Sequence, residues 1–144
     1  MRTLRATGTE DPVIRVLAVT PNQEDHAALE LILPHPKWIV HRARSLTSAK
    51  TKLRARNSIP VVLCERDLAP DSWRKMLEYL SHIDDPPLLV VTSRLADERL
   101  WAEALSLGVH DVLARPFDAS EVTRILSLAW LRWRHRHVRT GGRN

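Results

Sequence analysis

Two acidic side chains directly follow a short apolar run in the middle of the chain, and they are the residues best placed to do chemistry. Residues 61–64 read Val-Val-Leu-Cys, and Glu65, Arg66 and Asp67 come next. An apolar run of this length with charged residues after it predicts a strand buried on both faces, as in the centre of a parallel sheet. Ligand sites of open α/β sheets lie outside the carboxyl ends of the strands. Glu65 and Asp67 therefore mark the candidate site.

The rest of the chain alternates between strand and helix patterns that would position these acids. Short apolar runs predict strands at 14–19, 38–41, 61–64, 88–91 and 109–113. Each is followed by residues with helical spacing, and Asp118 with Glu121 three positions later forms a capping-box pattern before the last helix. Strands that alternate with helices predict an α/β fold, with a parallel sheet covered by helices on both faces.

Composition indicates one folded domain with polar ends. The chain has 144 residues, no apolar run approaches the roughly 20 residues that span a bilayer, and the N-terminal residues have no signal-peptide pattern. We expect a leader at 1–12, a domain at 13–133, a basic tail at 134–144 and a cytoplasmic location. Cys64 is the only cysteine, which excludes an intrachain disulfide, and its place in an apolar strand predicts a buried, inert thiol.

The net charge of +5 is unevenly distributed. The segment Arg42–Arg56 and the C-terminal segment from Arg132 are both rich in basic residues and contain no acid. Such segments can bind phosphate backbones or acidic partners, and they can equally be solvated faces.

Four passages make the chain resemble the receiver domain of response regulators. Glu65 stands where the family has its phosphoaccepting aspartate, Thr92-Ser93 match the hydroxyl residue and its small neighbour, and Arg115-Pro116-Phe117 resembles Lys-Pro-Phe. Residues 104–111, Ala-Leu-Ser-Leu-Gly-Val-His-Asp, resemble the family passage A-L-x-x-G-A-x-D. The resemblance covers about 13–133. It implies a flavodoxin-like (βα)5 doubly wound sheet with strand order 2-1-3-4-5, and a role in two-component or phosphorelay signalling.

Departures from the family pattern imply a pseudo-receiver that is not phosphorylated. Thr20 and Pro21 replace the two acids that hold Mg²⁺ in the family, so we expect the metal site to be lost and no cofactor to bind. Glu65 replaces the aspartate, Arg115 replaces the lysine, and Val112 occupies the aromatic switch position. Thr92 remains as a family-type functional residue.

Glu65 and Arg115 together suggest a built-in ion pair. A fixed carboxylate would stand where the family has aspartyl phosphate, and a guanidinium would contact it. Neutral drift in an unused pocket is the alternative, and Asp67 is a candidate displaced phosphoacceptor. Glu24 and Asp25 lie nearby in sequence, but we expect them inside the first helix rather than at the strand end.

The leading functional hypothesis is a protein-interaction module, working as a homodimer or with a partner protein. The last helix carries Leu128, Trp130 and Leu131 besides the core stripe of Val122, Ile125, Leu126, Ala129 and Trp133, so it has two apolar faces. The alternative is non-specific nucleic-acid binding through the C-terminal helix and Arg42–Arg56. We expect no enzyme activity, because the chain has no paired carboxylates, nucleophile elbow or glycine-rich phosphate loop.

Overall fold

The computed structural model describes residues 12–55 and 58–142, and it describes side chains as far as residue 136. Apart from residue 12, the predicted leader lies outside the described residues. Within the described part of the chain, no helix is both long enough and apolar enough to cross a membrane.

Five parallel strands form one sheet in the order β2-β1-β3-β6-β7. Their bounds are β1 (Ile14–Val19), β2 (Trp38–Ala43), β3 (Val61–Glu65), β6 (Leu88–Ser93) and β7 (Asp111–Ala114). Counted along the chain as members of this sheet, the strands stand in the order 2-1-3-4-5. The predicted α/β class and strand order are therefore confirmed.

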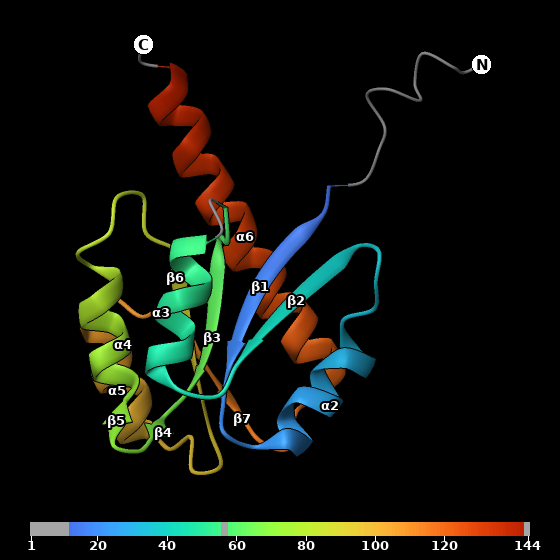
Figure 1. Ribbon diagram of the computed structural model, residues 1–144, viewed down its shortest axis with the longest axis vertical. Helices are drawn as coiled ribbons and strands as arrows, with labels where there is room; N and C mark the ends of the chain where they lie inside the picture. The colour runs from blue at the N-terminus through green and yellow to red at the C-terminus, as the bar shows by residue number, and fades with distance from the viewer. Residues whose placement is uncertain (1–11, 56–57, 143–144) are drawn as a thin grey trace.

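Helices cover both faces of this sheet (Figure 1). They are α2 (Gln23–Ile32), α3 (Leu46–Ala55), α4 (Trp73–Leu80), α5 (Glu98–Ser106) and α6 (Ala119–Gly142). The apolar residues of α3, α4 and α5 pack into one buried cluster, and those of α2 and α6 pack into another on the opposite face. Because every crossover is of the βα type, all five strands point their carboxyl ends to the same edge of the sheet.

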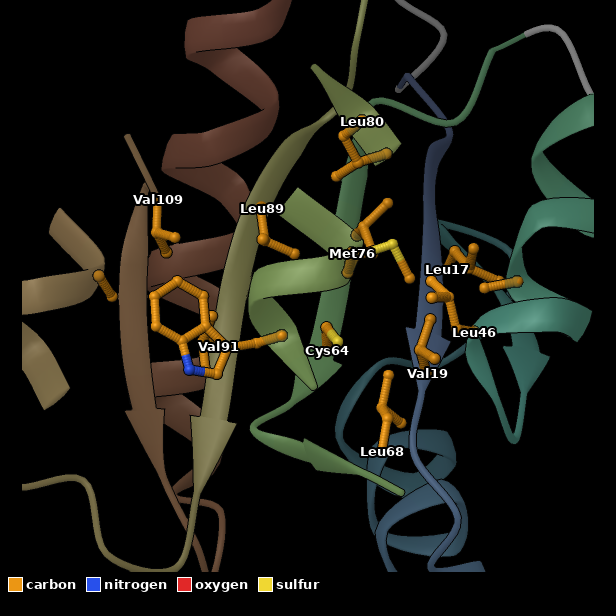
Figure 2. Close-up of a cluster of buried hydrophobic side chains, with 14 of the residues drawn as sticks. Leu17, Val19, Leu46, Cys64, Leu68, Met76, Leu80, Leu89, Val91 and Val109 are labelled. Atoms are coloured by element: carbon orange, nitrogen blue, oxygen red, sulfur yellow. The ribbon is translucent and has the colours of Figure 1, made fainter. Parts of the chain in front are cut away.

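The strand β3 lies at the centre of the sheet, and all five of its residues are buried. Cys64 contributes to the cluster under α3, α4 and α5, where it lies near Met76 and Val91 (Figure 2). Burial raises the pKa of the Cys64 thiol, which keeps it protonated and unreactive. The prediction of a buried thiol is confirmed.

The helix α6 packs one stripe of side chains against the face of the sheet opposite to α3, α4 and α5. Val122, Ile125, Leu126 and Ala129 are buried as expected. Trp133 was predicted to extend this stripe, but it is only partly buried. The reason is that α6 continues past the edge of the sheet (Figure 1), so the end of the stripe has less to pack against.

Several element boundaries differ from the expected ones. The helix α6 runs to Gly142, so it includes residues 134–142 of the segment that was expected as a basic tail. The last strand begins two residues later than predicted, at Asp111. A short antiparallel hairpin, β4 (Asp67–Leu68) with β5 (Asp71–Ser72), was not predicted, because two-residue strands are too short to show an alternating pattern.

Candidate functional site

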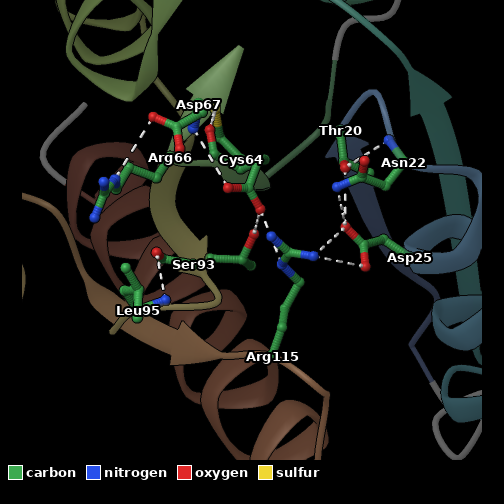
Figure 3. A network of polar contacts seen from close by, with 11 residues as sticks. Thr20, Asn22, Asp25, Cys64, Arg66, Asp67, Ser93, Leu95 and Arg115 are labelled. Atoms are coloured by element: carbon green, nitrogen blue, oxygen red, sulfur yellow. Dashed lines mark hydrogen bonds and ion pairs between the residues drawn. The ribbon is translucent and has the colours of Figure 1, made fainter. Parts of the chain in front are cut away.

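Three charged side chains meet at the carboxyl edge of the sheet. Arg115, which follows β7, places its Nε 3.0 Å from Oε1 of Glu65 and its Nη1 3.5 Å from Oδ2 of Asp25. The side chains of Arg115, Glu65 and Asp25 are 12%, 4% and 11% exposed. In Figure 3 the guanidinium of Arg115 reaches toward Asp25 on one side and the end of β3 on the other. The ion pair between Glu65 and Arg115 that the sequence suggested is present.

Glu65 ends β3 and is held by three groups. Besides Arg115, its Oε1 accepts a hydrogen bond from the Thr92 hydroxyl at 3.2 Å, and its Oε2 accepts one from the Asp67 backbone N–H at 3.4 Å. Burial raises the pKa of the Glu65 carboxyl, and Arg115 and these two hydrogen bonds offset only part of the rise. The carboxylate is thus fixed in position, and it is easier to protonate than an exposed glutamate.

Asp25 belongs to the site, contrary to the sequence-based expectation. It does lie inside α2, but in its first turn, where the side chain points back to the end of β1. Its Oδ2 accepts hydrogen bonds from the Thr20 hydroxyl at 3.0 Å and the Asn22 side-chain amide at 3.2 Å. Nη1 of Arg115 lies 3.5 Å from the same oxygen. The signal in the sequence was the spacing Thr20-x-Asn22-x-x-Asp25, which puts two donors within reach of one helical carboxylate.

A divalent cation of the kind that the resemblance implies does not fit these residues. Thr20 and Pro21, which follow β1, supply no carboxylates, and the oxygens of Asp25 already contact Thr20, Asn22 and Arg115. The guanidinium of Arg115 itself supplies the positive charge between Asp25 and Glu65. Among the residues that the structure describes, no group of three or more acidic, histidine or cysteine side chains is arranged to hold a metal.

The other residues singled out from the sequence have varied settings. Pro21 lines a cavity beside Glu65 and Arg115 at this edge. Asp67 is exposed and lies 3.6 Å from the Arg66 guanidinium, so it points away from the buried network. Val112 is buried in the core cluster under α5.

Comparison with known proteins bears on the fold. No family model and no curated protein matches the sequence. Solved structures do match. The signal receiver domain of an HD domain-containing protein from Pseudomonas fluorescens Pf-5 superposes with a TM-score of 0.79 at 20% identity, over 91% of this chain and 96% of that one. The receiver domain of a putative LuxO repressor protein from Vibrio parahaemolyticus gives a TM-score of 0.78 at 15% identity, over 88% and 96% of the two chains.

The chain has the fold of a response-regulator receiver domain. A further match is the beryllofluoride-activated NtrC4 receiver domain dimer, at TM-score 0.74 and 18% identity, over 83% of this chain and 98% of that one. Identities this low establish the receiver fold and leave the chemistry to this chain's own residues.

The last helix of this receiver fold presents two leucines to solvent. Leu128 and Leu131 are 48% and 51% exposed. Trp130 was expected beside them, but it is half-buried against the core cluster under α6, with the Arg134 guanidinium 5.2 Å from its ring centre. Trp130 nevertheless lines one cavity together with Leu131 and Ser127.

The two basic segments of this receiver fold lie on opposite sides of the sheet. The helix α3 covers one face and α6 covers the other. Several of the arginines are also engaged: Arg42 pairs with Glu30, and Arg136 donates a hydrogen bond to the Pro86 carbonyl. The described residues thus do not join the two segments into a single nucleic-acid surface.

Proposed function

We propose that this chain is a pseudo-receiver: a signalling module of the two-component type that acts by contact with another protein and is not phosphorylated. The observation that carries the proposal is the buried network of Glu65, Arg115 and Asp25. It fills the position of the family's phosphorylation site with a built-in carboxyl group and a built-in cation. A site whose buried charges are already paired in this way needs no phosphoryl group and no metal to hold one arrangement.

Neutral drift, the alternative, explains this network less well. Drift would leave unpaired charges or small residues in an unused pocket. Here two carboxylates from separate elements converge on one guanidinium, and both also accept hydrogen bonds from hydroxyl groups, those of Thr20 and Thr92. Buried charges are costly unless they are paired in this manner.

The contact surface that we propose is the outer face of α6. Fully burying a leucine side chain stabilises by about 1.5–3 kcal/mol, so burying the exposed half of Leu128 and Leu131 contributes about 1.5–3 kcal/mol per protomer. A symmetric dimer doubles this to about 3–6 kcal/mol before association costs of comparable size or larger. Such a surface suits a weak homodimer.

Charge favours contact between α6 and α5 of the second copy. Two copies of α6 packed on each other would bring Arg124 and Arg132 against their own counterparts. The helix α5 instead offers the exposed Glu98 and the half-exposed Trp101. Glu103, also on α5, is already bound by Arg74 through two hydrogen bonds of 2.6 and 2.8 Å.

Sedimentation of the purified chain tests this proposal. We expect the wild type to dimerise as concentration rises, without any phosphodonor, and the double variant Leu128→Glu, Leu131→Glu to stay monomeric. Leu31→Glu is the matched control, because Leu31 is 85% exposed on α2 and should not affect association. A wild type that stays monomeric at high concentration and captures no partner protein would contradict the proposed contact. A double variant that unfolds would place both leucines in the core.

A further inference from the structure

Three neighbouring strands of the sheet are each followed directly by an arginine. Arg66 follows β3, Arg94 follows β6 and Arg115 follows β7. Since β3, β6 and β7 are adjacent and parallel, these three residues start from one edge of the sheet. All three line the same cavity of about 330 Å³, which also opens onto Asn22 and Ser93.

The three arginines differ in how strongly they are already paired with carboxylates. Arg115 is buried and committed to Glu65 and Asp25. Arg66 is about a third exposed, and its ion pair is with its exposed neighbour Asp67, at 3.6 Å. Arg94 is exposed and has no ion pair with any described residue. Surface pairs such as the one between Arg66 and Asp67 contribute little and are easily exchanged for a stronger partner.

The lining of the cavity carries more positive than negative charge. Its charged side chains are Arg66, Arg94 and Arg115 against Glu65 and Asp67, an excess of one positive charge that is offset by Asp25, which pairs with Arg115 from outside the lining. Ser93 adds a neutral donor: its side chain is buried, its oxygen accepts the Leu95 N–H at 3.0 Å, and its own proton remains free to donate. Arginines and hydroxyl donors are the groups that bind phosphate oxygens in proteins.

An apolar side chain stands next to these donors. Leu95 is 67% exposed and lines the cavity, as does Pro21. Pockets that combine apolar walls with a few placed polar groups are typical of small-ligand sites, and the volume lies at the small end of their range. The cavity therefore suits a ligand with an anionic group and a compact apolar part.

We propose that this cavity binds a small phosphate monoester without covalent reaction. Arg66 and Arg94 hold the phosphate, Ser93 donates a further hydrogen bond, and the organic part lies against Leu95. The inference rests on the proposed function in one respect, that Glu65 is not phosphorylated. The ligand would then regulate the module from the edge of the sheet where the family uses a covalent phosphoryl group.

Titration of the full chain with phenyl phosphate, followed by NMR of the backbone amides, tests this inference. We expect saturable shifts at residues 93–95 and 22, and weaker binding of inorganic phosphate. Arg66→Ala and Arg94→Ala should each weaken binding about tenfold or more, because each removes a charged hydrogen-bond donor. Both side chains reach solvent, so the fold should survive, and thermal unfolding of each variant checks this.

Arg54→Ala is the matched control, since it removes the same charge from an exposed position on α3 that lies outside both proposed binding surfaces. Its affinity should equal that of the wild type. The site would be overturned if the wild type showed no saturable shift in the millimolar range, or if all three variants lost affinity equally. Equal affinity for phenyl phosphate and inorganic phosphate would overturn the assignment to an ester. Intact mass separates the two proposals: an unchanged mass with no binding defeats only this inference, whereas an added phosphoryl group defeats the proposed function as well.

Discussion

Replacing Arg115 by alanine should strongly destabilise the fold, because it leaves two buried carboxylates without their shared cation. Removing one partner of a buried ion pair typically costs about 3–5 kcal/mol. Glu65 can relieve part of this cost by taking up a proton, since burial already raises its pKa. Asp25 keeps its hydrogen bonds from Thr20 and Asn22. We therefore expect a loss near the lower end of that range, about 3 kcal/mol at neutral pH, and a smaller loss in mild acid.

Urea denaturation followed by tryptophan fluorescence measures this loss, and the buried Trp73 is a suitable reporter. Arg42→Ala is the control, because Arg42 forms an exposed ion pair with Glu30 whose removal should cost less than about 1 kcal/mol. Adding Glu65→Gln to an Arg115→Met variant should recover most of the stability that Arg115→Met loses. The wild type, the two single variants and the double variant then form a double-mutant cycle. An Arg115→Ala variant no less stable than the Arg42→Ala control would refute the view that this network holds the site.

Two further predictions concern single groups. The folded state binds the proton of Glu65 more tightly than the unfolded state, so this residue's contribution to stability should fall as pH rises from about 4.5 through the raised pKa. The free energy of unfolding of the wild type, relative to Glu65→Gln, should decline over that window, and a difference that stays flat with pH would contradict the raised pKa. Cys64 should resist thiol reagents in the native protein and react once the chain is unfolded in urea. Rapid modification without denaturant would show that β3 is not buried as described.

Much of the fold follows from the sequence because the apolar runs, the helical spacings and the breaker residues all indicate the same elements. Residues 61–64 form an apolar run too short for a helix, and the breakers around it separate strands from helices at intervals that fit only βα units. The end of α6 was harder to predict, because helical spacing alone does not say where the sheet beneath it ends. Trp130 and Trp133 are both partly buried, and Trp130 packs against the core cluster under α6.

The site was predicted where it depends on strand ends and was missed where it depends on a helix. Glu65 ends β3 and Arg115 follows β7, with only β6 between the two strands, and the parallel topology brings both residues to one edge. Asp25 lies six residues beyond Val19, where β1 ends, and only the turn into α2 returns its carboxylate to that edge. The three arginines were visible in the sequence, but the fourth strand was predicted to end at residue 91. Arg94 directly follows a strand only because β6 continues to Ser93.

The most direct test of the central claim is the intact mass of the protein after incubation with a small phosphodonor and Mg²⁺. A receiver domain known to be phosphorylated serves as the positive control in the same conditions. The pseudo-receiver proposal predicts an unchanged mass for this chain, because Arg115 occupies the position of the cation and Glu65 is held by Thr92 and Arg115. A stoichiometric phosphoryl adduct, on Glu65 or on the exposed Asp67, would contradict it.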